Sequence, residues 1–268
     1  MPPKPPLTHF LCLPLVTASS RSQLLASLQQ LTADVTDLGN EDSAVVPAKS
    51  IRPIGTFHLT LGVMSLQTPD RVAAASQFLR SLNVQEMLHG ATELDEPGPI
   101  NAQEAVKGTD LFPGIDGHSR GRFLENVFPL TITLSGLHPM HKPSSTSILY
   151  ASPLDDTSRL YPFSLALQQA FTKAEFLLPE DRDLLLHATI VNTTYAKEKK
   201  ARVKGGGHGK GSRKFDAQEV IAKYRDFKWA KDLRIEKLSI CEMGAKKIIE
   251  NEEVVDEEYL EIAGVPLP

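Results

Sequence analysis

Residues 57–61 read Phe-His-Leu-Thr-Leu, and residues 186–190 read Leu-His-Ala-Thr-Ile. Each stretch places a histidine and a threonine two positions apart, between apolar residues. Side chains of a β-strand alternate between its two faces, so each stretch predicts a strand with an imidazole and a hydroxyl on one face. The apolar residues would then line the opposite face and pack into a core.

Two such strands would form one small polar cleft if their His-Thr faces met. His58 and His187 are the candidate catalytic residues, because histidine has a reference pKa of about 6.5 and can take or give a proton near neutral pH. Thr60 and Thr189 are the candidate phosphate-binding residues, because their hydroxyls can donate to non-bridging phosphate oxygens. This set suits phosphoryl chemistry, and we expect it to need no metal and no other cofactor.

The apolar patterns around the motifs predict a similar series of elements in both halves of the chain. Strands are expected at 9–15, 56–66, 130–137, 147–152, 184–193, 234–243 and 258–262. Helices are expected after Ser19-Ser20, after Thr68, over 155–176 and over 216–227. This order predicts an α+β fold of two lobes related by an approximate twofold axis, with mixed or antiparallel sheets and outer helices.

The chain has 268 residues, a net charge of −4 and 41% apolar residues, as is typical of a folded globular protein. We expect a flexible arm at 1–7 and a single two-lobed domain over 8–268, with insertions near 84–127 and 197–214. Cys12 and Cys241 do not have the spacing of a zinc site. With so few cysteines, we expect an intracellular protein, nuclear or cytoplasmic. No apolar stretch is long enough to predict a membrane partner, and no heptad repeat predicts assembly, so we expect a monomer.

A basic, glycine-rich segment, residues 197–214, follows the second motif. Lys199, Lys200 and Arg202 are candidate contacts to a nucleic-acid backbone, because phosphate contacts dominate such affinity. A nuclear-targeting signal or a solvated insertion is the alternative. Tyr195 is a candidate platform for stacking a base, since aromatic rings bind bases of any sequence. This segment favours RNA as the partner.

Other conspicuous residues have simpler interpretations. His138 and His141 are expected in a surface turn, and His9 in a structural role on the first strand. Phe57 should face the core, opposite His58, and Trp229 should also contribute to packing. The acidic run at 250–258 is interpreted as a solvated turn or loop.

Four stretches resemble a known family: HFLCLPL at 9–15, TFHLTLGVMSL at 56–66, LLHATIVNT at 185–193 and KFDAQEVIAKYRDFKWAKDLRIEKLSICEMG at 214–244. The chain resembles the 2H phosphoesterase superfamily, which is named for two His-hydrophobic-Thr/Ser-hydrophobic motifs. Within that superfamily it is most similar to the phosphoesterase domain of A-kinase anchoring protein seven and of activating signal cointegrator complex subunit one. The resemblance covers residues 8–262.

The resemblance implies a two-lobed fold of the RNA ligase and cyclic phosphodiesterase type, with the active cleft between the lobes. It implies catalysis by His58 and His187 and phosphate binding by Thr60 and Thr189, without metal. It also implies RNA-type substrates: 2′,5′-linked oligonucleotides, 2′,3′-cyclic phosphates or RNA 3′ ends. Ala188 is small where the family commonly has larger aliphatic residues.

The main alternative is a non-catalytic RNA-binding or scaffold protein, with a partner in a protein complex. The basic segment and the family's adaptor members favour it, whereas the presence of both histidines and both threonines opposes it. A ligase activity is a third possibility, but the sequence has no nucleotide-activating lysine motif.

Overall fold

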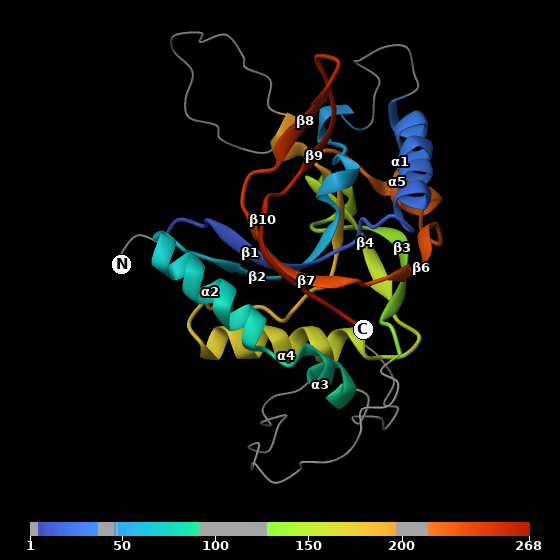
Figure 1. The fold of residues 1–268 in the computed structure, drawn as a ribbon. Helices are drawn as coiled ribbons and strands as arrows, with labels where there is room; N and C mark the ends of the chain where they lie inside the picture. Colours follow the sequence, from blue (N-terminus) through green and yellow to red (C-terminus); the bar gives the residue numbers. More distant parts are fainter. Residues whose placement is uncertain (1–4, 37–45, 47, 92–127, 197–213) are drawn as a thin grey trace.

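The computed structural model describes residues 5–36, 46, 48–91, 128–196 and 214–268 (Figure 1). The strands are β1 (His9–Pro14), β2 (His58–Met64), β3 (Thr131–Pro139), β4 (Ile148–Leu154), β5 (Ala188–Asn192), β6 (Lys228–Arg234), β7 (Lys237–Glu242), β8 (Lys246–Glu250), β9 (Glu253–Glu258) and β10 (Glu261–Pro266). The helices are α1 (Arg21–Thr36), α2 (Pro69–Ser81), α3 (Val84–Gly90), α4 (Leu160–Lys173) and α5 (Gln218–Lys223). Short 3-10 helices are η1 (Ala48–Ser50), η2 (Ile54–Thr56), η3 (Pro143–Ser145) and η4 (Thr193–Ala196).

Two four-stranded antiparallel sheets form the body, with strand orders β10-β7-β1-β2 and β5-β4-β3-β6. The motif strands, β2 and β5, each lie at the edge of a sheet. Each pairs with the strand that comes before it in the chain, β1 for β2 and β4 for β5. A helix joins the strands of each pair, in the series β1-α1-β2 and β4-α4-β5. The expected α+β architecture with two related halves is therefore confirmed.

Backbone contacts across the two halves bring the motif strands together. Ile51 forms an antiparallel bridge with Val191 of β5, and the Arg52 N–H donates to the Ile190 carbonyl at 2.8 Å. On the other side, the Gln168 amide of α4 donates to the Leu61 carbonyl of β2 at 2.8 Å. The exposed edge of each motif strand thus finds partners in the other half of the chain, and β2 and β5 lie next to each other.

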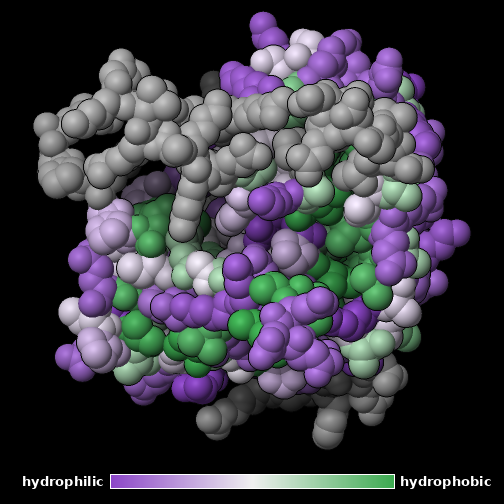
Figure 2. Space-filling view, turned by 90° about the horizontal axis from the view of Figure 1, so that it is seen from above, coloured by the Kyte–Doolittle hydropathy of each residue, from purple (hydrophilic) through white to green (hydrophobic). Residues whose placement is uncertain are grey.

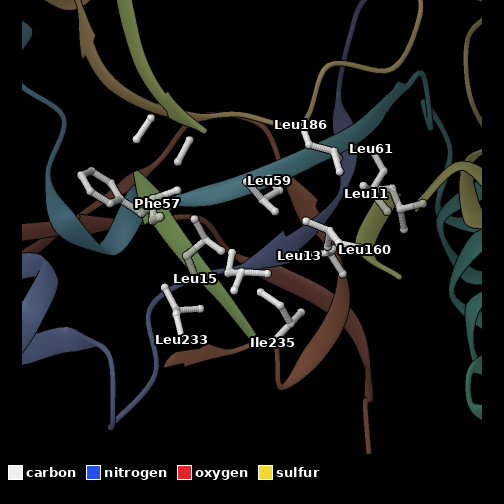
Figure 3. Packing of buried hydrophobic residues seen from close by; sticks show 14 of the residues in the cluster. Leu11, Leu13, Leu15, Phe57, Leu59, Leu61, Leu160, Leu186, Leu233 and Ile235 are labelled. Carbon is white, nitrogen blue, oxygen red and sulfur yellow. The ribbon is translucent and has the colours of Figure 1, made fainter. Parts of the chain in front are cut away.

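The apolar faces of the motif strands form the core. Leu59 and Leu61 of β2 are fully buried with Leu11 and Leu13 of β1, and Leu186 lies near Leu61 (Figure 3). The expected strand alternation is confirmed, because Phe57 is only 2% exposed while its neighbour His58 is half-buried. Leucines occupy every second position of β1 and β2 on the core side; in β1 the opposite face, with Phe10 and Cys12, is buried as well.

Helices cover the outer surfaces of both sheets (Figure 1). α2 and α4 lie side by side, and the rings of Phe78 and Phe171 pack edge-on between them with centroids 5.0 Å apart. Thr68 caps α2 by accepting a hydrogen bond from the Arg71 N–H, as its place before Pro69 predicts. Seen from above, hydrophilic residues form most of the rim of the described surface, and hydrophobic patches lie nearer its middle (Figure 2).

Several element predictions were wrong. The acidic run at 250–258 is not a loop: β8 and β9 form an antiparallel hairpin, with charged side chains interleaved among Ile249, Val254 and Val255. β6 was missed because charges interrupt its alternation and Asp232 has a φ of 52°, which accompanies irregular pairing with β3. His138 is the last residue but one of β3 and does not lie in a turn.

Two other differences concern helices. Residues 84–90 form α3, which Asn83 caps, so the first residues of the insertion expected near 84–127 are helical. α5 is shorter than the expected 216–227 because the chain leaves the helix at Tyr224, which is buried and donates to Asp34 at 2.6 Å. Residues 92–127 and 197–213, and with them most of the two insertions expected near 84–127 and 197–214, lie outside the described residues. The assignment of 8–268 to one domain stays a prediction.

Candidate active site

Both motif histidines are held by the same local device. The Nδ1–H of His58 donates to the Thr56 carbonyl at 2.7 Å, and that of His187 donates to the Leu185 carbonyl at 2.9 Å. The acceptor is in both cases the backbone two residues earlier. A carbonyl can only accept, so the proton of each neutral ring is assigned to Nδ1 and Nε2 is left as the base. Such a bond fixes both tautomer and ring orientation.

His58 is enclosed by two aromatic rings. Phe10 of β1 lies 4.8 Å from it between ring centroids, and Tyr259, between β9 and β10, lies at 5.3 Å with its plane at 88°. Phe10 and Tyr259 also contact each other at 4.9 Å. One flank of the His58 ring is therefore shielded by apolar edges, while Nδ1 is occupied by the backbone.

This enclosure lowers the pKa of His58 to about 4, from an ordinary 6.5. Burial is the largest cause, since it penalises the charged imidazolium; the Thr56 carbonyl acts in the opposite direction. The positive charges of His187 and Arg52 lower the pKa further, which places both groups within electrostatic reach of His58. His58 is thus a neutral base at physiological pH in the unliganded site.

His187 lies immediately before β5 and is half-buried. Its ring packs against Tyr150 of β4 at 5.2 Å, and Tyr150 in turn packs against His138 of β3 at 5.6 Å. A row of three rings, in edge-on and tilted contact, thus runs from His187 along the second sheet. The small size of Ala188 suits its position, because it is fully buried opposite another short side chain, Ala151 of β4.

Thr60 and Thr189 occupy the positions that alternation assigns to them. Thr60 lies opposite Cys12 of β1 and Thr189 opposite Tyr150 of β4, and both threonines are half-buried. Within the described ranges, neither hydroxyl forms a hydrogen bond. Both hydroxyls are therefore available to a ligand that enters beside the histidines.

Arg52 and Tyr195 were not expected to meet. The Arg52 guanidinium lies 3.8 Å from the centroid of the Tyr195 ring, and Arg52 is only 5% exposed. Both groups affect the pKa of Tyr259. Burial and Tyr195 raise this pKa to about 12, whereas the positive charge of Arg52 acts to lower it. Tyr195 is 53% exposed and stacks on this cation, so any base that it binds must use its outer face.

The β8–β9 hairpin carries Tyr259 to the site. Asp256 of β9 is buried and accepts hydrogen bonds from Arg21 of α1 at 2.6 Å and from the Gly55 N–H at 3.0 Å. Gly55 must be small, because a Cβ there would lie 2.6 Å from the Glu257 carbonyl oxygen. One carboxylate thus fixes the hairpin to the turn that precedes His58.

A pocket of about 610 Å³ opens beside His58. Its walls include Phe10, Cys12 and Cys241 from the sheet, together with Lys237 and Tyr259. The volume falls in the range of common small-molecule sites, and the lining combines apolar side chains with charged ones, among them Arg21, Glu258 and Glu261. In the described part of the chain, no three His, Cys, Asp or Glu side chains gather as a metal ion would require.

Comparison with known proteins agrees with this geometry. A family model described as the AKAP7 2'5' RNA ligase-like domain matches residues 7–252. The chain belongs to this family. The resemblance to the 2H phosphoesterase superfamily and to its AKAP7-like branch is thereby confirmed, and the family supports a phosphoesterase or RNA ligase-like function.

The individual proteins and structures compared with this AKAP7-like domain have low sequence identity to it. An uncharacterized protein of Schizosaccharomyces pombe is 28% identical over 168 residues, which are 62% of this chain and 72% of that protein. Among solved structures, Escherichia coli LigT complexed with 3'-AMP has a TM-score of 0.46 at 10% identity, with 98% of each chain covered. TT0787 of Thermus thermophilus has a TM-score of 0.44 at 9% identity, with 97% of each covered.

The structure places the four motif residues in one region, as expected, but their roles stay predictions. Lys199, Lys200 and Arg202 lie outside the described residues. Sequence reasoning missed Tyr259, Tyr150 and Phe10, for which the sequence carries no signal because distant elements deliver them. Arg52 had a weak signal: it is a lone cation in the otherwise uncharged run at 51–57. No described helix is long and apolar enough to cross a membrane.

Proposed function

We propose that this AKAP7-like domain is a metal-independent phosphodiesterase that acts on RNA-type phosphoesters by two-histidine acid–base catalysis. The observation that carries the proposal is the shared Nδ1–H bond to the carbonyl two residues earlier, which leaves Nε2 of both His58 and His187 for proton transfer. A purely structural histidine would not need the same tautomer and backbone acceptor in both halves. Positioned acid–base groups contribute roughly 10²–10⁴-fold to rate.

We assign the base to His58 and the acid to His187. His58 is neutral at physiological pH, because burial and nearby positive charges depress its pKa, so its Nε2 can accept a proton. In hydrolysis of a 2′,3′-cyclic phosphate, His58 Nε2 takes a proton from water as the water oxygen attacks phosphorus. The protonated His187 Nε2 then gives a proton to the ribose oxygen as its bond to phosphorus breaks. Thr60 and Thr189 donate to the non-bridging oxygens.

Two features support an RNA-type substrate. The pocket beside His58 has room for a nucleoside, and the rings of Phe10 and Tyr259 offer aromatic surface for a base. The basic segment after the second motif, with Lys199, Lys200 and Arg202, would add sequence-independent attraction for the backbone. The substrates that fit the proposal are 2′,5′-linked oligonucleotides, 2′,3′-cyclic phosphates and RNA 3′ ends.

The test is turnover of these three substrate types, with 3′,5′-linked oligonucleotides for comparison, in the presence of EDTA. We expect turnover of at least one, lost in both His58→Ala and His187→Ala. His141→Ala is the control, because His141 is an exposed histidine outside the site. Wild-type protein that binds RNA but turns over none of the substrates would favour the scaffold alternative. Activity that EDTA abolishes would contradict the metal-independent part.

A further inference from the structure

Arg52 is a buried cation, and no carboxylate of the described residues forms an ion pair with it. Its side chain is 5% exposed, and its Nη2 has no hydrogen-bond partner among the described residues. By contrast, Arg21 forms an ion pair with Asp256, and Lys237 forms one with Glu261. A guanidinium does not lose its proton in proteins, so Arg52 remains charged. Burying an unpaired charge is costly, and a fold keeps one where an anion is to bind.

The backbone around Arg52 directs this cation toward the cleft. Ile51 pairs with Val191 and packs against the core, and successive side chains of an extended segment point to opposite sides. Arg52 therefore points away from the core, on the side of the candidate catalytic groups. Its N–H is fixed to Ile190, the residue after Thr189, while its charge reaches His58. One residue thus touches the second motif strand and faces the histidine of the first.

Aromatic side chains hold the guanidinium in place. Its central carbon lies 3.8 Å from the Tyr195 ring centroid, a cation–π distance, and the Tyr259 hydroxyl lies close enough for Arg52 to affect its pKa. These contacts restrict the orientation of the planar group without neutralising it. A guanidinium prepared in this way suits a phosphate, whose oxygens it can bind through two parallel N–H groups.

We infer that Arg52 is a phosphate-binding residue of this site, whose free Nη2 donates to a non-bridging oxygen of the substrate phosphate held between His58 and His187. The inference rests on the proposed phosphodiesterase function and adds to it a permanent positive charge, which neither Thr hydroxyl supplies. It also makes phosphate affinity persist at alkaline pH, because a guanidinium stays protonated there.

Inorganic phosphate is the probe, because its binding does not require turnover. We would measure its affinity at fixed ionic strength by calorimetry and by the phosphate-induced rise in melting temperature, at pH 7 and pH 8.5. Arg52→Met keeps much of the side chain's length without its charge, and we expect it to lower phosphate affinity about tenfold or more at both pH values. Arg52→Lys keeps the charge but not the planar group, and we expect it to recover part of the affinity.

Arg71→Met is the matched control. Arg71 also lies over an aromatic ring, 4.7 Å from the Phe176 centroid, but its Nη2 donates to the Glu175 carbonyl, and neither contact involves a residue of the candidate site. We expect it to bind phosphate as the wild type does. Without phosphate, Arg52→Met should melt at or above the wild-type temperature, because it removes an uncompensated buried charge.

Two results would overturn the inference. One is a folded Arg52→Met protein that binds phosphate as tightly as wild type. The other is a pair of observations that a purely structural role predicts. In that case Arg52→Met would be too unstable to study, and Arg52→Lys would lose stability but keep the full phosphate affinity. Failure of the proposed function looks different: wild type would bind phosphate through Arg52 and yet turn over no substrate.

Discussion

The ring of Tyr259 packs edge-on against the ring of His58, with centroids 5.3 Å apart and planes at 88°. These residues lie in segments far apart in the chain, and the β8–β9 hairpin brings them together. The hairpin is anchored by Asp256 to Arg21 and to the Gly55 N–H, just before the first motif. The C-terminal part of the chain therefore sets the environment of the proposed base.

The pKa of His58 should depend on Tyr259. In Tyr259→Ala, water gains access to the imidazole, so we expect the His58 pKa to rise from about 4 toward 6.5. Titration of the histidine ring protons by NMR measures this directly. Tyr259→Phe keeps the ring contact, and its His58 pKa should stay near the wild-type value. Equal His58 pKa values in Tyr259→Ala and wild type would show that the ring does not cause the shift.

The Asp256 carboxylate should stabilise the hairpin and support activity. Asp256→Ala leaves Arg21 and the Gly55 N–H without their shared partner, and we expect a loss of about 1–3 kcal/mol in the free energy of unfolding. Urea denaturation measures it. Activity should fall as well, because Tyr259 is no longer held against His58. Glu253→Ala, at an exposed position of the same hairpin, is the control for which both quantities should be unchanged.

Stability should fall as the pH drops from 6.5 toward 4. The pKa of His58 is lower in the folded state than in the unfolded state, so the unfolded state binds the extra proton in this window and is favoured there. Above pH 6.5 both states are neutral at this residue and its full contribution is present. Urea denaturation at several pH values should give a shallower acid-side slope for His58→Gln than for wild type. His9 and His138, whose pKa values burial also lowers, remain in both proteins. Parallel pH profiles would contradict this assignment.

The basic segment should contribute to RNA affinity through charge alone. Replacing Lys199, Lys200 and Arg202 by glutamine should weaken RNA binding and flatten its salt dependence. The slope of log affinity against log salt should fall by up to about 0.7 for each phosphate of a single strand that the variant no longer neutralises. Filter binding at several salt concentrations measures both. Hydrolysis of a small cyclic phosphate, which lacks the extended backbone that the segment would contact, should be unaffected. If RNA affinity and slope both match wild type, the segment is a solvated insertion.

The sequence predicted those parts of the fold that depend on local periodicity. Leu59 and Leu61 alternate with His58 and Thr60, and this pattern alone correctly assigned each residue to its face of β2. It failed for β6, where Asp232 in a left-handed conformation breaks the alternation, and for the β8–β9 hairpin, whose charged surface resembles a loop.

The surroundings of the site could not be predicted for a different reason. Arg52 reaches the cleft because Ile51 pairs with Val191, and Tyr259 reaches it because Asp256 pairs with Arg21. Both depend on contacts between distant segments, and neither has a periodic pattern. The motif histidines were identifiable only because they occur twice with the same spacing.

The central claim is that His58 and His187 act together on one phosphate. It is tested most directly by kcat/KM for the best substrate in wild type, His58→Ala, His187→Ala and the double variant, with EDTA present. The account predicts that each single variant loses roughly 10²–10⁴-fold and that the double variant loses far less than the product of the two, because the groups serve one reaction. A single variant that keeps the wild-type kcat/KM, or losses that multiply in the double variant, would contradict it.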